Sequence, residues 1–181
     1  MKQVVEPIRS KKDIKMVEKY LIERNFRNYV IFVFGINTGL RISDILGLNV
    51  SDVFDKTYVE IIEKKTGKYK RFPLNNKLKT LLEKYLINKN INEPLFTSLK
   101  HCRLDRSQVY RFLNEACKNC NIRANIGTHT MRKTFGYHHY KKFNDVVLLQ
   151  KILNHSSSSI TLRYIGISQE EIDISYNNFE L

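Results

Sequence analysis

The chain has 181 residues, of which 42% are hydrophobic and 27% charged, and this balance excludes wholesale disorder and fits one domain with a sizeable core. The longest apolar run, residues 29–36, is too short to span a bilayer, and the first residues lack the apolar stretch of a signal peptide. We therefore expect a soluble, cytoplasmic protein. The formal net charge of +13 favours a polyanionic partner, because each phosphate contact releases condensed counterions. The basic residues are spread along the chain, which indicates a folded nucleic-acid-binding face rather than a basic tail.

The first elements in the chain are predicted to be helical. Residues 10–13, Ser-Lys-Lys-Asp, are typical of a helix start, and the apolar residues that follow share one face. A second helix is predicted over residues 27–37, where the apolar run indicates burial. The Gly39 turn breaks the pattern, and a third, short helix is expected from about Arg41 to Gly47.

The pattern then changes to that of a β-hairpin. Residues 57–62 and 70–74 are rich in β-branched and aromatic side chains, and the basic segment 64–68 between them contains a glycine. Helical patterns resume afterwards, over residues 77–88, 106–119, 128–141, 145–153 and 158–165, with a last short helix over 169–176. The sequence therefore predicts a mainly α domain with a small antiparallel β-sheet (α+β).

The cysteines give little sign of a metal site or of disulfides. Their odd number, three, and the absence of an export signal indicate free thiols. Cys117 and Cys120 form a single CxxC pair, with His101 and Cys102 as conceivable further ligands, but the second pair that zinc sites usually show is absent. We expect no metal and no small-molecule cofactor.

Four segments carry residues suited to phosphodiester chemistry. They are Thr38-Gly-Leu-Arg-Ile-Ser-Asp-Ile45, the turn at Lys65, His129-Thr-Met-Arg132, and Leu153-Asn-His-Ser156 with Tyr164 nine residues after its histidine. In this order and spacing the whole chain resembles the tyrosine recombinase (phage integrase) family. The resemblance implies the fold of that family's catalytic domain, which breaks and rejoins DNA strands.

The residue types also fit the chemistry on physical grounds. A phosphodiester transition state concentrates charge on the non-bridging oxygens, and arginine offers a permanently charged, bidentate donor for them. Arg41 follows a glycine-containing turn, and Arg132 lies three positions after His129, so the side chains at 129 and 132 share a helix face.

The reaction further needs a nucleophile and proton transfers. A tyrosine ester of phosphate keeps the bond energy for rejoining, and guanidinium and imidazole groups can neutralise the charge without a metal. Free tyrosine has a pKa near 10, so Tyr164 needs a base or a positive field, for which His129 is the natural candidate. His155 would donate a hydrogen bond to the phosphate. A lysine on a mobile hairpin can protonate the leaving 5′-oxygen.

The resemblance assigns these roles residue by residue. Arg41 matches the first arginine, His129 and Arg132 match the HxxR box, and Tyr164 matches the nucleophile. His155 matches the His/Trp position of an LGHSS-like segment, in which Asn154 replaces the common glycine at a helix end. Asp44 matches an acidic position that braces the site, and Lys65 matches the hairpin lysine, with Lys64 the nearest rival and Lys68 a weaker one.

Each of these residues taken alone has a structural interpretation, as a surface arginine, a helix-cap histidine or a core tyrosine. The alternative tyrosines, Tyr137, Tyr140 and Tyr176, lack the spacing from His155. The first two lie on the helix of Arg132 and are predicted to be packing residues. His138 and His139 match no family position and are predicted to be surface or core residues.

The domain organisation is predicted from the same resemblance. Residues 1–181 would form a single catalytic domain, because the forty residues before Arg41 are too few for the N-terminal helical clamp domain of most family members. Residues 167–181 form an acidic, amphipathic tail after a basic body. Either this tail docks on a neighbouring subunit of a DNA-bound homotetramer, or its apolar residues pack on their own domain.

The leading functional hypothesis is site-specific recombination of double-stranded DNA through a 3′-phosphotyrosyl intermediate, without a metal. One alternative is a DNA-binding or regulatory protein that keeps the fold without catalysis, but such a protein has no use for the nucleophile. A type IB topoisomerase shares the chemistry, while the compact size and the LGHSS-like segment favour the recombinase.

Overall fold

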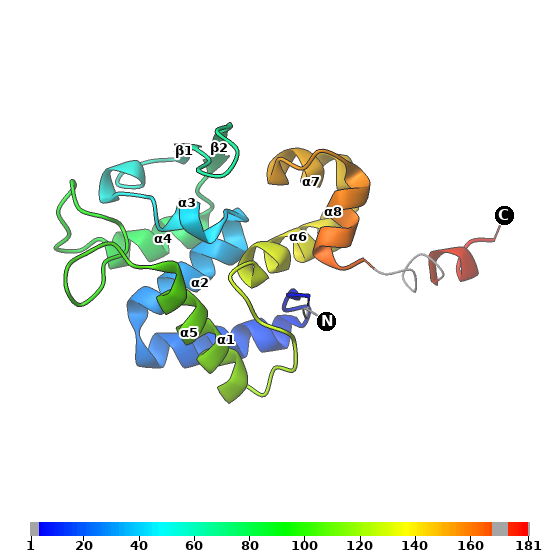
Figure 1. Cartoon of the computed structure of the whole chain (residues 1–181), viewed down its shortest axis with the longest axis horizontal. Helices are drawn as coiled ribbons and strands as arrows, with labels where there is room; N and C mark the ends of the chain where they lie inside the picture. The colour runs from blue at the N-terminus through cyan, green and yellow to red at the C-terminus, as the bar shows by residue number, and fades with distance from the viewer. Residues whose placement is uncertain (1–3, 168–173, 181) are drawn as a thin grey trace.

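The structure is a computed structural model that describes residues 4–167 and 174–180, and it is mainly helical with one two-stranded antiparallel sheet (Figure 1). The predicted fold class is confirmed. The elements, in chain order, are α1 (Lys11–Arg24), α2 (Phe26–Thr38), α3 (Ile42–Ile45), the 3₁₀ helix η1 (Val50–Asp52), β1 (Tyr58–Ile62), β2 (Tyr69–Pro73), α4 (Asn76–Tyr85), α5 (Arg106–Asn119), α6 (Thr130–Phe143), α7 (Val146–Leu153) and α8 (Ser158–Ile165).

The predicted elements agree with these bounds to within a few residues. α5 and α8 begin and end where the sequence placed them, and α4 ends three residues earlier than predicted, at Tyr85. Sequence analysis missed the short η1. The helix predicted over 169–176 falls largely on residues 168–173, which lie outside the described part of the chain. In the described ranges, 4–167 and 174–180, no helix has the length and apolar character needed to cross a membrane.

Helix α2 forms the centre of the main core. Its residues 30–35 are buried without interruption, because α1, α4, α5 and α6 all pack around it. The packing against α6 is tight, since a Cβ atom on Gly35 would come within 2.8 Å of the sulfur and 3.0 Å of the Cβ of Met131. The missing side chain at Gly35 permits this separation without a shift of Met131, and it brings the end of α2 next to the first turns of α6.

A second, much smaller hydrophobic cluster joins α6 to the last two helices. Its fully buried members are Leu149 and Leu153 on α7 and Ile165 on α8. Tyr137 and Tyr140 of α6 pack against this C-terminal cluster, so their predicted role as packing residues is confirmed. In Figure 1, α7 and α8 lie together beyond α6, on the far side from α1 and α5.

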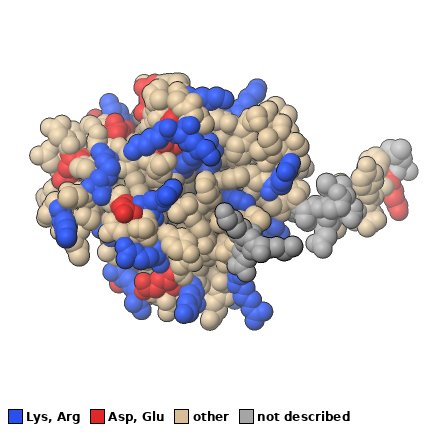
Figure 2. Space-filling view, in the orientation of Figure 1, with Lys and Arg blue, Asp and Glu red and all other residues tan. Residues whose placement is uncertain are grey.

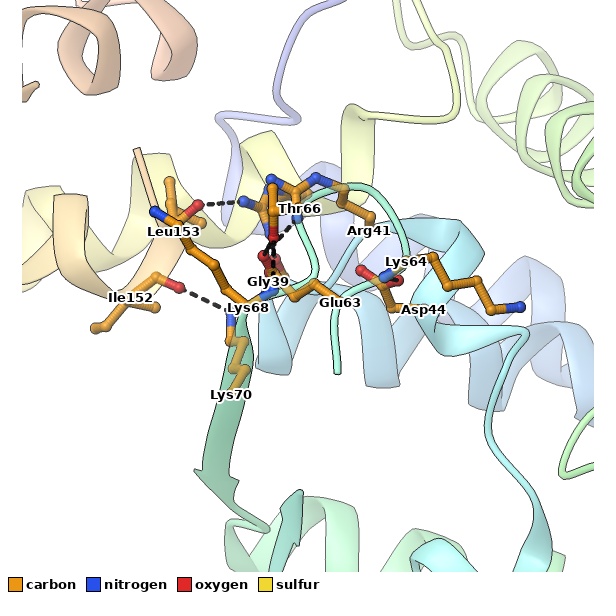
Figure 3. A network of polar contacts seen from close by, with 11 residues as sticks. Gly39, Arg41, Asp44, Glu63, Lys64, Thr66, Lys68, Lys70, Ile152 and Leu153 are labelled. Atoms are coloured by element: carbon orange, nitrogen blue, oxygen red, sulfur yellow. Dashed lines mark hydrogen bonds and ion pairs between the residues drawn. The ribbon is translucent and has the colours of Figure 1, made fainter. Parts of the chain in front are cut away.

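The hairpin of β1 and β2 pairs Val59 with Phe72 and Ile61 with Lys70. Phe72 and Lys70 share the buried face of β2, while the residues that alternate with them, Tyr69, Arg71 and Pro73, face solvent. The connecting turn, residues 63–68, projects toward α3 and α7 (Figures 1 and 3).

Candidate active site

Arg41 is placed by the sharp end of α2. Gly39 adopts the left-handed conformation with φ 62°, and a Cβ atom there would lie 2.3 Å from the ring of Phe135. A side chain at this position would therefore be strained and would clash. The chain turns and Arg41 becomes the residue that precedes α3, with its Nη1 2.9 Å from Oε2 of Glu63.

The base of the hairpin turn is fixed to α3 by two carboxylates. Asp44 is buried, and its Oδ1 accepts a hydrogen bond from the main-chain nitrogen of Lys64 at 3.0 Å. Glu63 is also buried, and its Oε2 accepts a hydrogen bond from Oγ1 of Thr66 at 2.7 Å while it pairs with Arg41 (Figure 3). Burial opposes ionisation of Glu63, but hydrogen bonds from Thr66, Asn154 and Arg41 outweigh it and lower the pKa to about 2.

The three lysines of the turn are exposed but differ in direction. Lys64 lies along Gly47 and points away from Arg41 (Figure 3). Lys65 is close enough to His129 for its charge to depress the pKa of that imidazole. This places Lys65, the first candidate for the hairpin lysine, within electrostatic reach of a predicted site residue. Lys68 is the last residue of the turn, directly before β2.

Arg132 bonds to the C-terminal ends of two helices, α2 and α7, that are far apart in the sequence. On α6 its side chain is buried, with Nη1 donating to the carbonyl oxygen of Gly39 and Nη2 donating to that of Leu153, both at 2.6 Å. Burial lowers the pKa of Arg132, although a guanidinium remains charged at any physiological pH. The residue therefore brings a permanent charge to the point where α2 and α7 end.

Tyr164 lies between the two predicted histidines. Its hydroxyl is 3.3 Å from Nδ1 of His129, the residue before α6, and its ring meets the ring of His155 edge-on at 4.9 Å between centroids. His155 follows Asn154, which ends α7 in the left-handed conformation. Asparagine tolerates that conformation well, so the replacement of glycine there is explained. Nδ1 of His155 lies 3.1 Å from Oγ1 of Thr161.

Electrostatics keeps both histidines neutral near pH 7. Burial and then the charge of Arg132 lower the pKa of His129, and the same two causes, in the same order, lower that of His155 to about 4. Burial raises the pKa of Tyr164, while the positive charges of Arg132 and Arg41 act in the opposite direction. Burial is the larger of these effects, so the pKa of Tyr164 is raised overall and the phenol is protonated near pH 7, beside an imidazole that is free to accept its proton.

The structure thus brings together Arg41, His129, Arg132, His155 and Tyr164, and Asp44 bonds to the adjoining turn that carries Lys65. Sequence reasoning missed three residues of this network, Glu63, Lys70 and Thr161. Lys70 could have been noticed, because strand alternation places it on the same face as the apolar Phe72. No pattern in the sequence singled out Glu63 or Thr161.

The remaining candidates have structural roles. Nε2 of His138 lies 3.0 Å from the carbonyl oxygen of Ile8, and the ring of His139 packs between two phenylalanines of α6. Cys117 and Cys120 are buried, and burial raises the pKa of both thiols, that of Cys117 to about 12. Among the residues that the structure describes, no group of three or more His, Cys, Asp or Glu side chains could hold a metal ion.

Comparisons with known proteins agree with this arrangement. The sequence model of the Phage integrase family matches residues 10–171. The chain is 46% identical over 177 residues to a probable integrase/recombinase, YoeC, of Bacillus subtilis (strain 168), and covers 97% of each protein. It is 31% identical over 151 residues to a tyrosine recombinase of Pseudothermotoga lettingae, covering 82% of this chain and 52% of that protein.

Solved structures share the fold. The crystal structure of XerA recombinase superposes with a TM-score of 0.81 at 21% identity, covering 100% of this chain and 66% of that one. A lambda integrase tetramer bound to a Holliday junction superposes with a TM-score of 0.73 at 18% identity, covering 91% of this chain and 49% of that one. The chain therefore spans almost all of the Bacillus protein but only about half to two thirds of these other matches.

Proposed function

Because the chain belongs to the phage integrase family and is a tyrosine-type recombinase, we propose that it cuts and rejoins DNA through a 3′-phosphotyrosyl bond to Tyr164. The observation that carries this proposal is the 3.3 Å approach of the Tyr164 hydroxyl to Nδ1 of His129, within the field of Arg41 and Arg132. A buried tyrosine hydroxyl usually has a hydrogen-bond partner, and here that partner is an imidazole nitrogen, which can also accept the proton of the phenol.

The proposed cleavage step assigns each proton and bond. Arg41 and Arg132 bind the non-bridging oxygens of the scissile phosphate and stabilise the charge of the transition state. His129 takes the proton of Tyr164, whose oxygen attacks phosphorus, and the bond from phosphorus to the 5′-oxygen breaks. Lys65 gives a proton to that leaving oxygen. Rejoining is the reverse, with a 5′-hydroxyl as the nucleophile.

His155 is assigned to the phosphate as well. Oγ1 of Thr161 lies 3.1 Å from the carbonyl oxygen of Ser157 and donates to it, so Nδ1 of His155 is left to donate to Thr161. The other ring nitrogen then faces the site as an acceptor until it is protonated. A phosphate bound beside Arg41 and Arg132 favours the imidazolium, which donates to a non-bridging oxygen. The charge supplied by these residues makes a metal ion unnecessary for the proposed step.

The proposed substrate is double-stranded DNA, bound by more than one copy of the chain. The net charge of +13 supports a nucleic-acid partner. Figure 2 shows Lys and Arg side chains over much of one face, with a group across its upper middle, where Figure 1 places α3 and the hairpin. The lambda integrase that shares the fold was crystallised as a tetramer on a Holliday junction, and we propose a homotetramer on DNA here too.

The test is covalent capture on nicked duplexes that lose the cleaved fragment and so trap the intermediate. The wild-type chain should form a protein–DNA adduct that survives denaturation, and Tyr164→Phe should form none while it still binds DNA. Tyr140→Phe is the matched control, because Tyr140 packs on the same C-terminal cluster and should retain the adduct. An adduct that persists in Tyr164→Phe would contradict the assignment of the nucleophile.

A further inference from the structure

Lys70 is a buried lysine outside the set of proposed catalytic residues. It lies on the inner face of β2 with 8% of its surface exposed, and its Nζ donates to the carbonyl oxygen of Ile152 at 2.7 Å (Figure 3). Burial, followed by the charge of Arg132, lowers its pKa to about 8. Lysine is rarely so buried unless its ammonium has a specific partner, so the bond to Ile152 explains why the residue is not apolar.

The partner of Lys70 is the end of α7. Ile152 and Leu153 are among the last residues of that helix, whose carbonyl oxygens have no partner within the helix once Asn154 reverses the chain. Lys70 satisfies the first of these oxygens and Arg132 satisfies the second. Both cations also lie at the negative end of the helix dipole, where positive charge is favoured. His155 follows directly, and α8 with Tyr164 comes next.

The bond from Lys70 to Ile152 connects the end of α7 to the hairpin. Lys70 pairs with Ile61 across the hairpin, and the turn between the two strands carries Lys65. The side of the turn that faces α3 is held by Asp44 and Arg41, as described above. Lys70 bonds the same hairpin to α7 from the strand side, and Glu63 of the turn bonds to Asn154 where that helix ends. The hairpin is therefore attached to both halves of the site.

We propose that Lys70 is a positioning residue, which bonds the Lys65 hairpin to the corner between α7 and α8 and so brings the general acid and the nucleophile to the same phosphate. The inference rests on the proposed function, because it assigns Lys70 an effect that acts through Lys65. It predicts that loss of the ammonium impairs protonation of the leaving group more than attack by Tyr164.

The experiment measures single-turnover cleavage on two matched duplexes, one with the natural 5′-oxygen at the scissile bond and one with a 5′-bridging sulfur. A sulfur leaving group needs no proton. Lys70→Met keeps the length of the side chain without the ammonium and should slow cleavage of the oxygen substrate by about 10- to 100-fold. The Lys70→Met variant should cleave the sulfur substrate at a rate within about threefold of the wild-type rate. We expect the same of Lys65→Ala, which lacks the proposed general acid. Lys70→Arg, which restores a cationic donor, should recover most of the lost rate.

Controls separate this inference from folding defects and from the proposed function. Lys118→Met, on the exposed surface of α5, should behave as wild type on both substrates. Thermal unfolding shows whether Lys70→Met folds, and Lys70→Gln provides the same comparison if it does not. Equal slowing on the two substrates, or no slowing on either, would overturn the role of Lys70. Failure of the wild-type chain to form an adduct on either substrate would count instead against the proposed function.

Discussion

The two halves of the site are built differently. Arg41, Asp44 and Glu63 belong to elements that pack into the main core, which extends through α1 to α6. The proposed nucleophile, Tyr164, lies on α8, and α7 and α8 are held to the rest through the C-terminal cluster, whose fully buried members are three side chains. The half that we assign to phosphate binding is thus part of the main core, whereas the half that carries Tyr164 has little apolar contact to fix it.

Polar bonds compensate for this small apolar contact. Arg132 and Lys70 bond the end of α7 to α6 and β2, and His129 meets the hydroxyl of Tyr164. Regions with few buried apolar contacts open more readily than a main core does. The position of the proposed nucleophile therefore depends in part on Arg132, which we also propose as a phosphate ligand, so a bound phosphate would act on both halves at once.

Replacement of Arg132 should have the largest effect, because this residue belongs to both halves. Arg132→Ala removes a proposed phosphate contact and leaves the carbonyl oxygens of Gly39 and Leu153 without donors. We expect covalent cleavage to fall by about a thousandfold or more and the free energy of unfolding by about 2–4 kcal/mol. Adduct formation on nicked duplexes and urea unfolding measure the two effects. Arg106→Ala, at an exposed position on α5, is the control and should change neither. Cleavage by Arg132→Ala at a rate near that of the wild type would show that the halves are not joined through this residue.

Two leucine substitutions test whether the halves differ in rigidity. Leu153 in the C-terminal cluster and Leu113 in the main core are both fully buried. Replacing either leucine with alanine should lower the free energy of unfolding by about 2–5 kcal/mol. We expect Leu153→Ala to reduce the cleavage rate by about tenfold and to speed hydrogen exchange in α7 and α8. Leu113→Ala should lower the melting temperature yet cleave at nearly the wild-type rate well below it. If both variants lose cleavage equally at matched stability, the two halves respond as one unit.

The sequence predicted the fold and most of the site because its signals are local. Helix periodicity and caps located α5 and α8, and strand alternation with a glycine-containing turn located the hairpin. The proposed catalytic residues were found through short motifs in a fixed order, and the structure packs α2 against α6 at Gly35 and Met131, and α7 and α8 against α6.

What the sequence could not predict are pairs set by tertiary packing. In the sequence, Glu63 is a carboxylate at the end of a predicted strand, within a basic stretch. Nothing near it in the chain indicates that its ion-pair partner is Arg41, twenty-two positions earlier. The bond from Lys70 to Ile152 joins positions 82 residues apart. Both interactions depend on how the hairpin lies against α3 and α7, which no local pattern encodes.

The smallest expected effect is on the pH dependence of DNA affinity. It tests whether a bound phosphate acts on both halves of the site. In the free protein the pKa of His155 is about 4, below the ordinary value near 6.5, so its imidazole is neutral at pH 6. A phosphate between Arg41 and Arg132 should raise that pKa, so DNA binding takes up a proton between pH 4 and 6.5. Affinity should therefore rise as the pH falls from 7 to 5.5, by about two- to fivefold, in fluorescence anisotropy at fixed ionic strength. His155→Gln should flatten this dependence.

The free protein should show the opposite trend in stability, which provides an internal check. Because the folded-state pKa of His155 is depressed, the unfolded chain binds the proton first, and stability falls as the pH drops from 6.5 toward 4. His129, whose pKa is also lowered, contributes with the same sign and remains in His155→Gln. Glu63, with a pKa of about 2, stays ionised between pH 5.5 and 7, so its pair with Arg41 cannot produce either trend in that interval. If the pH dependence of binding survived in His155→Gln at full strength, His155 would not be the group that connects the phosphate to the half of the site that carries Tyr164.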